Sequence, residues 1–106
     1  MIMNKKDLKW AIDGNRITIW MKCPDHQPPH VHAFLVEKKE DVIIIETQMR
    51  DEGENLKNKD LKICQNWIRE NKIMLLTKWA ELERLGHIPK PITVLKRTIL
   101  DLLVNL

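Results

Sequence analysis

Three of the four histidines in this sequence lie close together, at His26, His30 and His32, and Asp25 stands directly before the first of them. They belong to residues 23–34, which read C-P-D-H-Q-P-P-H-V-H-A-F. Imidazole and carboxylate groups can hydrogen-bond, exchange protons near neutral pH or bind metal ions. Because histidines gather nowhere else in the chain, we take this stretch as the candidate functional site.

The prolines of this stretch determine what kind of structure it can form. Pro24, Pro28 and Pro29 each restrict φ to about −65° and lack an N–H group, so the segment cannot be the interior of a helix. We expect a stiff, extended turn. The residues after Pro29 read as a strand, and on a strand His30 and His32 point to the same face because they are two positions apart.

Three roles remain open for this cluster. In the first, Asp25 and the histidines only hydrogen-bond the turn to the sheet. In the second, His26, His30 and His32 could bind Zn²⁺ or another divalent metal, with Asp25 or Cys23 as a further ligand or as a partner of a ligand. The spacing H-x3-H-x-H matches no specific zinc signature.

The third role is acid–base chemistry on RNA. One imidazole would take the proton of a 2′-hydroxyl group, a second would protonate the leaving oxygen, and a nearby cation would hold the phosphate. Under this hypothesis Lys22 binds phosphate, and the catalytic residues are Asp25, His26, His30, His32 and Arg16.

Other catalytic patterns are missing from the sequence. It has no glycine-rich phosphate loop, no G-x-S-x-G elbow and no H-E-x-x-H helix, which argues against nucleotide hydrolysis, serine hydrolysis and zincin chemistry. The net charge of +3 and the pI near 9.0 are compatible with nucleic acid as a partner but do not require it.

Two cysteines far apart, with no C-x-x-C pair, are typical of reduced thiols in the cytoplasm. No apolar run approaches the roughly 20 residues that a membrane span needs. We therefore expect a cytoplasmic protein without a membrane segment.

The first half of the chain predicts strands. Residues 8–12 and 16–21 flank Asp-Gly-Asn at 13–15, a pattern typical of a β-hairpin. Residues 30–37 and 42–47 predict a third and a fourth strand, and the β-branched V-I-I-I run favours burial on both faces for the fourth. The charged residues 38–41 between them predict a solvated loop.

The second half predicts helices. Leu61, Cys64, Ile68, Leu75, Trp79 and Leu82 recur at helical spacing, which predicts one amphipathic helix from residue 59, with Asn58 as its N-cap and Gly86 as its terminator. The expected fold is α+β: an antiparallel sheet of about four strands with helices packed on one face. We expect a single domain over residues 1–91, followed by an apolar C-terminal helix at 92–106 that packs in the core or forms an interface.

Three segments of the sequence together resemble a known family. They are R-I-T-I-W-M at 16–21, D-H-Q-P-P-H-V-H at 25–32 and N-W-I-R-E-N-K-I-M-L-L-T-K-W at 66–79. They are similar to the small bacterial proteins called domain of unknown function 4160, whose marks are D-H-x-P-P-H-x-H and a helix with two tryptophans. The resemblance covers about residues 14–91, and the tail after residue 92 departs from the pattern.

This resemblance implies a function that the residues alone do not. Members are proposed as toxins of toxin–antitoxin pairs, so it implies a toxic activity and an antitoxin protein as partner. The residues that match the motif are Asp25, His26, Pro28, Pro29, His30 and His32. We thus expect the toxin of a type II module that acts on RNA through the histidines. The alternative is a non-catalytic module that binds metal or regulates by protein contact. Separately, the apolar C-terminal segment could serve self-association into a homo-oligomer or contact with the partner.

Overall fold

The computed structural model describes residues 8–23 and 25–89. The expected helix at 92–106 lies outside the described residues. The strands and helices follow in the order β1 (Lys9–Ile12), β2 (Ile17–Trp20), β3 (His30–Phe34), β4 (Asp41–Ile44), β5 (Arg50–Glu52), α1 (Asn58–Glu70) and α2 (Lys72–Arg84). The fold is therefore α+β, as the sequence predicts, with five strands rather than about four.

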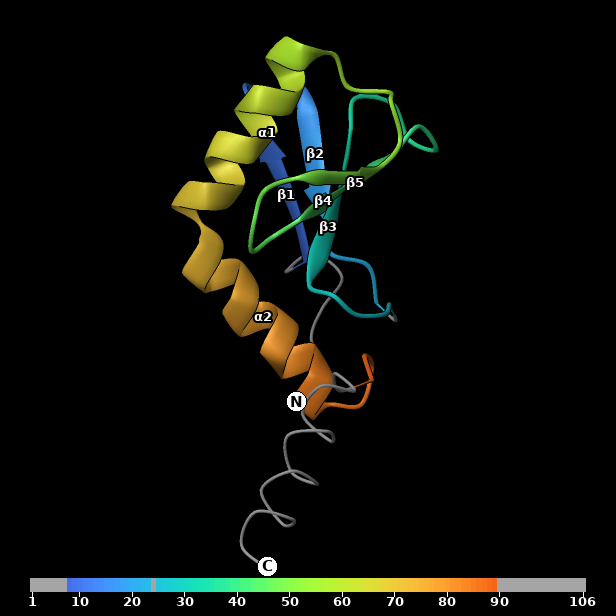
Figure 1. The fold of residues 1–106 in the computed structure, drawn as a ribbon, viewed down its shortest axis with the longest axis vertical. Helices are drawn as coiled ribbons and strands as arrows, with labels where there is room; N and C mark the ends of the chain where they lie inside the picture. Colours follow the sequence, from blue (N-terminus) through green and yellow to red (C-terminus); the bar gives the residue numbers. More distant parts are fainter. Residues whose placement is uncertain (1–7, 24, 90–106) are drawn as a thin grey trace, which may run out of the picture.

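The five strands form one antiparallel sheet in which each strand pairs with its neighbours in the sequence, in the order β1-β2-β3-β4-β5. Figure 1 shows α1 and α2 on one side of this sheet, with α2 continuing past the ends of the strands. The first hairpin forms as predicted, because Asp13, Gly14 and Asn15 all adopt positive φ, at 53°, 63° and 66°. Glycine, aspartate and asparagine tolerate that conformation best.

The core lies between the sheet and the helices. Alternate residues of the strands face it, including Ile17 and Ile19 of β2 and Val31 and Ala33 of β3, all with no exposed surface. The helices contribute the predicted stripe, and its fully buried members are Cys64, Ile68, Leu75, Trp79 and Leu82. The strand expected to be buried on both faces, β4, lies inside the sheet, but its alternate residues Val42 and Ile44 are only half-buried.

The expected single helix is broken at Asn71. There the backbone N–H and the side-chain amide of Asn71 both donate to the carbonyl oxygen of Trp67, at 3.0 and 2.9 Å. An asparagine that competes for backbone hydrogen bonds in this way ends a helix turn readily. The N-cap is Lys57, without a side-chain cap, so the expectation for Asn58 was wrong.

The predicted terminator is confirmed. Gly86 adopts φ of 82°, its N–H donates to the Glu83 carbonyl at 3.1 Å, and the next N–H, of His87, donates to the Leu82 carbonyl at 2.9 Å. This pair of bonds is the Schellman motif, which ends a helix by using a left-handed residue.

The charged loop expected at residues 38–41 includes one buried carboxylate, that of Asp41. Asp41 has no exposed surface and begins β4. It accepts hydrogen bonds from the backbone N–H groups of Asn55 and Leu56 at 2.9 and 2.8 Å, and it pairs with Arg50 at 3.1 Å. These bonds tie the chain ahead of α1 to the sheet, so the prediction of a solvated loop was wrong for this residue.

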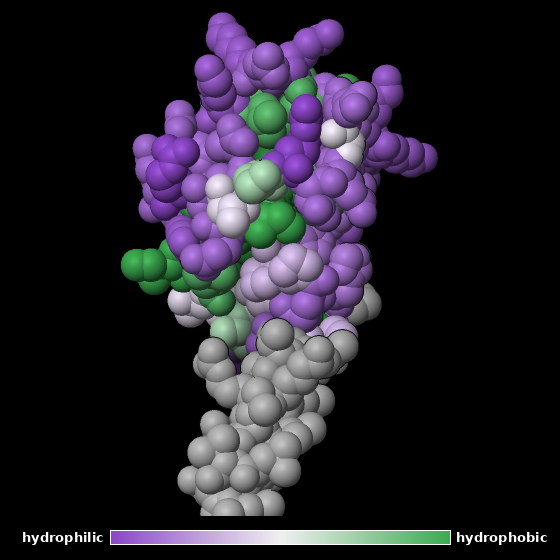
Figure 2. All heavy atoms as spheres, viewed as in Figure 1, coloured by the Kyte–Doolittle hydropathy of each residue, from purple (hydrophilic) through white to green (hydrophobic). Residues whose placement is uncertain are grey.

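Hydrophilic residues cover most of the face shown in Figure 2, and hydrophobic residues appear there in small separate groups. Within residues 8–23 and 25–89, the exposed large hydrophobic residues are Leu35, Val36, Met49 and Ile73. Among the described residues, no helix has the length and apolar composition needed to cross a membrane.

The buried stripe yields the first prediction. Replacing Leu75, which has no exposed surface, by alanine should lower the free energy of unfolding by about 2 to 5 kcal/mol, because the cavity cannot collapse fully. Lys62→Ala, on the exposed side of α1, is the control and should change it by less than about 0.5 kcal/mol. Urea denaturation measures both, and equal effects would show that the helix faces are assigned wrongly.

Asp41 yields a pH-dependent prediction. Burial alone would raise the pKa of Asp41, but the hydrogen bonds from Leu56, Asn55 and Arg50 outweigh burial and hold it below its usual value. A carboxyl group with a lowered folded-state pKa contributes stability above its unfolded pKa of about 3.9, and loses that contribution as the pH falls.

Asp41→Asn should therefore destabilise the protein at pH 7, by about 1 to 3 kcal/mol. The difference in the free energy of unfolding between this variant and the unmodified chain should become smaller as the pH falls below about 4. Urea denaturation between pH 3 and pH 7 measures it, with the exposed Asp51→Asn as the control. If the difference in the free energy of unfolding does not change with pH, the assignment of an ionised carboxylate to Asp41 is wrong.

Candidate functional site

The proline turn connects β2 to β3, and Gln27 holds it against α2. The side-chain Nε2 of Gln27 donates to Glu83 Oε1 at 2.7 Å and to the Pro89 carbonyl oxygen at 2.9 Å. Its Oε1 accepts from the indole N–H of Trp79 at 3.3 Å. A single amide thus contacts α2 at two residues and the chain after it at a third, which fixes the turn that carries Asp25.

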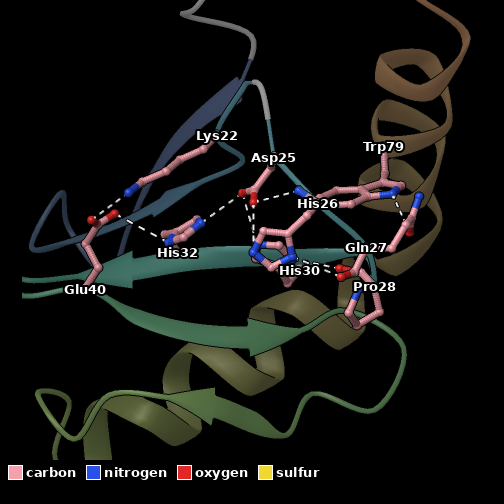
Figure 3. Close-up of polar contacts among 9 residues, drawn as sticks. All are labelled: Lys22, Asp25, His26, Gln27, Pro28, His30, His32, Glu40 and Trp79. Carbon is pink, nitrogen blue, oxygen red and sulfur yellow. Dashed lines mark hydrogen bonds and ion pairs between the residues drawn. The ribbon is translucent and has the colours of Figure 1, made fainter. Parts of the chain in front are cut away.

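Asp25 lies at the centre of the histidine cluster (Figure 3). Its Oδ2 lies 3.0 Å from His30 Nε2 and 3.1 Å from His32 Nε2. Its Oδ1 accepts the backbone N–H of His26 at 2.9 Å and lies 3.7 Å from His26 Nε2. The structure therefore brings together all four residues of the predicted cluster around one carboxylate.

The contacts of His30 define its tautomer. Its Nδ1 lies 2.7 Å from the Pro28 carbonyl oxygen, and a carbonyl oxygen can only accept, so Nδ1 carries a hydrogen. In the neutral ring, Nε2 then holds a lone pair and faces the carboxylate oxygen of Asp25. The ring is buried, with 3% of the side chain exposed, and its centroid lies 5.2 Å from that of Trp79.

His32 lies between two carboxylates. Its Nε2 faces Asp25, and its Nδ1 lies 3.6 Å from Oε2 of Glu40. The other oxygen of Glu40 pairs with Lys22 at 2.8 Å, while Oε2 is buried without a hydrogen-bond partner among the described residues. Lys22, Glu40, His32 and Asp25 thus form a continuous row of charged and titratable groups, which Figure 3 shows.

The pKa values in the cluster shift in different directions. Burial lowers the pKa of His32, and the hydrogen bond to Asp25 opposes this in part. The hydrogen bond to the Gln27 carbonyl, followed by the charge of Asp25, raises the pKa of the exposed His26. For Asp25 itself, burial would raise the pKa, but the hydrogen bonds from His32 and the His26 N–H outweigh it and lower the net value.

Arg16 is not brought to this cluster. It lies at the end of the first hairpin, where it pairs with Asp13 at 2.7 Å and with Asp60 at 2.5 Å. Trp20 is the cross-strand partner of His32, and Arg16 lies four residues before it, in the turn just ahead of β2, which at about 3.3 Å per residue is roughly 13 Å away. The catalytic role expected for Arg16 has no support in this placement, because two carboxylates already hold its guanidinium elsewhere.

Among the described residues, Cys23 and His87 do not belong to the group whose ligand atoms converge. Cys23 is exposed with a free thiol, and His87 is exposed beyond α2. The group whose ligand atoms converge consists of Asp25, His26 and His30. It therefore includes Asp25 in place of the His32 that the sequence suggested.

Gln27 and Glu40 contribute to the site, although sequence reasoning did not select either residue. Gln27 offered a signal, because it lies inside the histidine stretch and an amide can donate and accept at once. Glu40 offered none, since it lies in a run of charged residues and only the pairing of β3 with β4 brings it next to His32.

The role of Gln27 can be tested directly. Gln27→Ala should lower the free energy of unfolding by about 1 to 3 kcal/mol, because it leaves the Trp79 N–H and the Pro89 carbonyl oxygen without their partner. Gln65→Ala is a graded control, since Gln65 donates a single hydrogen bond, to Gln48. A loss no larger than that of the control, measured by urea denaturation, would contradict the proposed link.

Comparison with known proteins places the chain in a family. The family model described as Domain of unknown function (DUF4160) matches residues 14–80, a range that includes the whole histidine cluster and most of both helices. No curated protein and no solved structure matches the chain. Because the model covers more than half of the sequence, this chain belongs to the DUF4160 family.

Proposed function

We propose that this protein is the toxin of a toxin–antitoxin pair and that it acts on RNA through the cluster around Asp25. One observation carries the proposal: a single carboxylate lies 3.0 to 3.7 Å from a ring nitrogen of each of three imidazoles, of which His30 and His32 are buried and His26 is exposed, with 77% of its side chain accessible. Buried groups can hold geometry while an exposed one meets a substrate, and this division is typical of catalytic sites.

The arrangement supports acid–base chemistry on a phosphodiester. Asp25 holds Nε2 of His32, so Nδ1, which lies 3.6 Å from Glu40 Oε2, is the nitrogen left to accept the proton of a 2′-hydroxyl group that reaches this side of the ring. His26, which is exposed and lies near the other oxygen of Asp25, supplies a proton or a positive charge near the leaving oxygen. Lys22 lies in the same row and is the cation available to a phosphate group.

A second candidate function is a protein-interaction module that works by contact alone. A cavity of about 290 Å³ is lined by Leu35, Val36, Lys39, Glu54, Asn55 and Leu56. Leu35 and Val36 are 40% and 61% exposed, and exposed apolar residues beside a hollow are typical of protein contacts. An antitoxin could use this surface under either function.

The RNA proposal is tested with single-residue variants expressed in a bacterial host. The unmodified chain should arrest growth and, once purified, cleave single-stranded RNA to leave a cyclic phosphate. His26→Ala and His32→Ala should each lower cleavage by about 100-fold or more, the usual effect of removing an acid or a base. His87→Ala is the matched control, because that histidine is exposed and distant from Asp25 in the sequence.

Stability measurements separate chemistry from folding. The melting temperature of His26→Ala should stay within a few degrees of the unmodified chain, since the side chain is exposed. If His26→Ala and His32→Ala fold and still arrest growth, the cluster is not the toxic site. If the unmodified chain neither arrests growth nor cleaves RNA, the interaction module is the better account.

A further inference from the structure

We propose that Asp25, His26 and His30 form a binding site for a divalent transition metal, with Zn²⁺ as the best match. Each residue offers one ligand atom, and these atoms all lie within 4.8 Å of one another. The inference goes beyond the RNA proposal and does not depend on it, because it concerns what the cluster binds rather than what it cleaves.

The ligand atoms are near enough for side-chain movements to bring them to the spacing of a tetrahedral site. His30 Nε2 lies 3.0 Å from Asp25 Oδ2, and His26 Nε2 lies 3.7 Å from Asp25 Oδ1. Bonds of about 2.0 to 2.1 Å to a tetrahedral zinc ion place neighbouring ligand atoms about 3.3 Å apart. The two observed contacts use different oxygens of Asp25, and the three ligand atoms all lie within 4.8 Å of one another, so side-chain movements would have to bring them to this spacing around the ion.

The hydrogen bond of His30 prepares it as a ligand. A histidine that binds a metal through one ring nitrogen usually donates the N–H of the other to a carbonyl or carboxylate oxygen. His30 Nδ1 does this with the Pro28 carbonyl at 2.7 Å, which leaves Nε2 free to coordinate. When the ring is neutral, two lone pairs, on His30 Nε2 and Asp25 Oδ2, face each other at 3.0 Å, and a positive ion between them, a proton or a metal, would relieve their repulsion.

Exposure leaves the site open on one side. The side chains of Asp25 and His30 are 9% and 3% exposed, whereas that of His26 is 77% exposed. A metal held by these three residues would keep a position toward solvent. Three protein ligands with one open position are typical of catalytic zinc sites, in contrast to closed structural ones.

The chemistry of the ligands selects the class of metal. Two imidazole nitrogens with one carboxylate oxygen suit zinc and similar transition metals, whereas Mg²⁺ and Ca²⁺ prefer oxygen alone. His32 is assigned to the surroundings of the site, because its Nε2 lies 3.1 Å from Asp25 Oδ2 and can donate to the carboxylate that binds the metal. The ring of His32 stays outside the triad. Under the RNA proposal, a bound metal would supply the positive charge assigned there to His26, and His32 would remain the base.

The test measures metal uptake by the full chain after treatment with a chelator. Titration with Zn²⁺ in a calorimeter, and with Co²⁺ followed by visible absorption, should show one ion per chain at micromolar concentration. His26→Ala should weaken binding by at least about 100-fold, and His87→Ala, the matched control, should not change it. His32→Ala should keep the stoichiometry of one ion and lose at most about 10- to 100-fold in affinity, as partners of ligands do.

The choice of variants keeps the inference open to refutation. His30 is buried against Trp79, so His30→Ala could unfold the chain, whereas the exposed His26 decides the question without that complication. No saturable uptake by the unmodified chain, or equal uptake by His26→Ala and His87→Ala, would overturn the site. Loss of the ion in His32→Ala but not in His26→Ala would overturn the ligand assignment.

The outcome is also distinguishable from that of the RNA proposal. Saturable binding of Zn²⁺ by a chain that leaves RNA intact would support the metal site and reject the function. Cleavage that continues at full rate in the chelator-treated chain, with no uptake of Co²⁺ or Zn²⁺, would reject the metal site and support the function.

Discussion

The geometry of the site depends on the side-chain amide of Gln27. Asp25 and His26 belong to a turn between two strands, and strand pairing alone does not fix such a turn. Gln27 bonds to Trp79 and Glu83 of α2 and to Pro89 beyond it, so the end of the helix supports the turn. Because α2 extends past the sheet (Figure 1), it reaches a region that the strands leave uncovered. The break at Asn71 lets α2 start as a separate helix, and the site therefore depends on both halves of the chain.

One strand serves both the core and the site. In β3 the residues Val31 and Ala33 have no exposed surface and pack in the core with the helices. His30 and His32 alternate with them and face the carboxylate of Asp25. The two-residue period of a strand separates these sets by geometry alone. The same pleat that buries the apolar residues therefore holds the two imidazoles at fixed positions, and rigid positions of this kind are what a functional site needs.

Local patterns predicted much of this structure, and long-range pairing accounts for what they missed. The hairpin at Gly14, the end of α2 at Gly86 and the shared face of His30 and His32 all depend on residues a few positions apart. The buried position of Asp41 depends instead on Asn55 and Leu56, and the placement of Arg16 depends on Asp60, 44 residues away. Strand β5 was missed for the same reason: Arg50–Glu52 is short and charged, and only its pairing with β4 makes it a strand.

The charges of the cluster connect its two proposed properties. Asp25 and Glu40 bring two carboxylates into a region where the side chain of Asp25 is 9% exposed and that of Glu40 is 21% exposed. Lys22 pairs with Glu40, and no other lysine or arginine among the described residues pairs with either carboxylate. A poorly solvated carboxylate without a compensating charge is costly. With neutral imidazoles the cluster is one positive charge short, and either a proton on a histidine or a metal ion at Asp25 supplies it. A protonated histidine and a bound metal ion would thus balance the same charge, and under the RNA proposal the solvent-facing side of His26 is where either would meet a phosphate group.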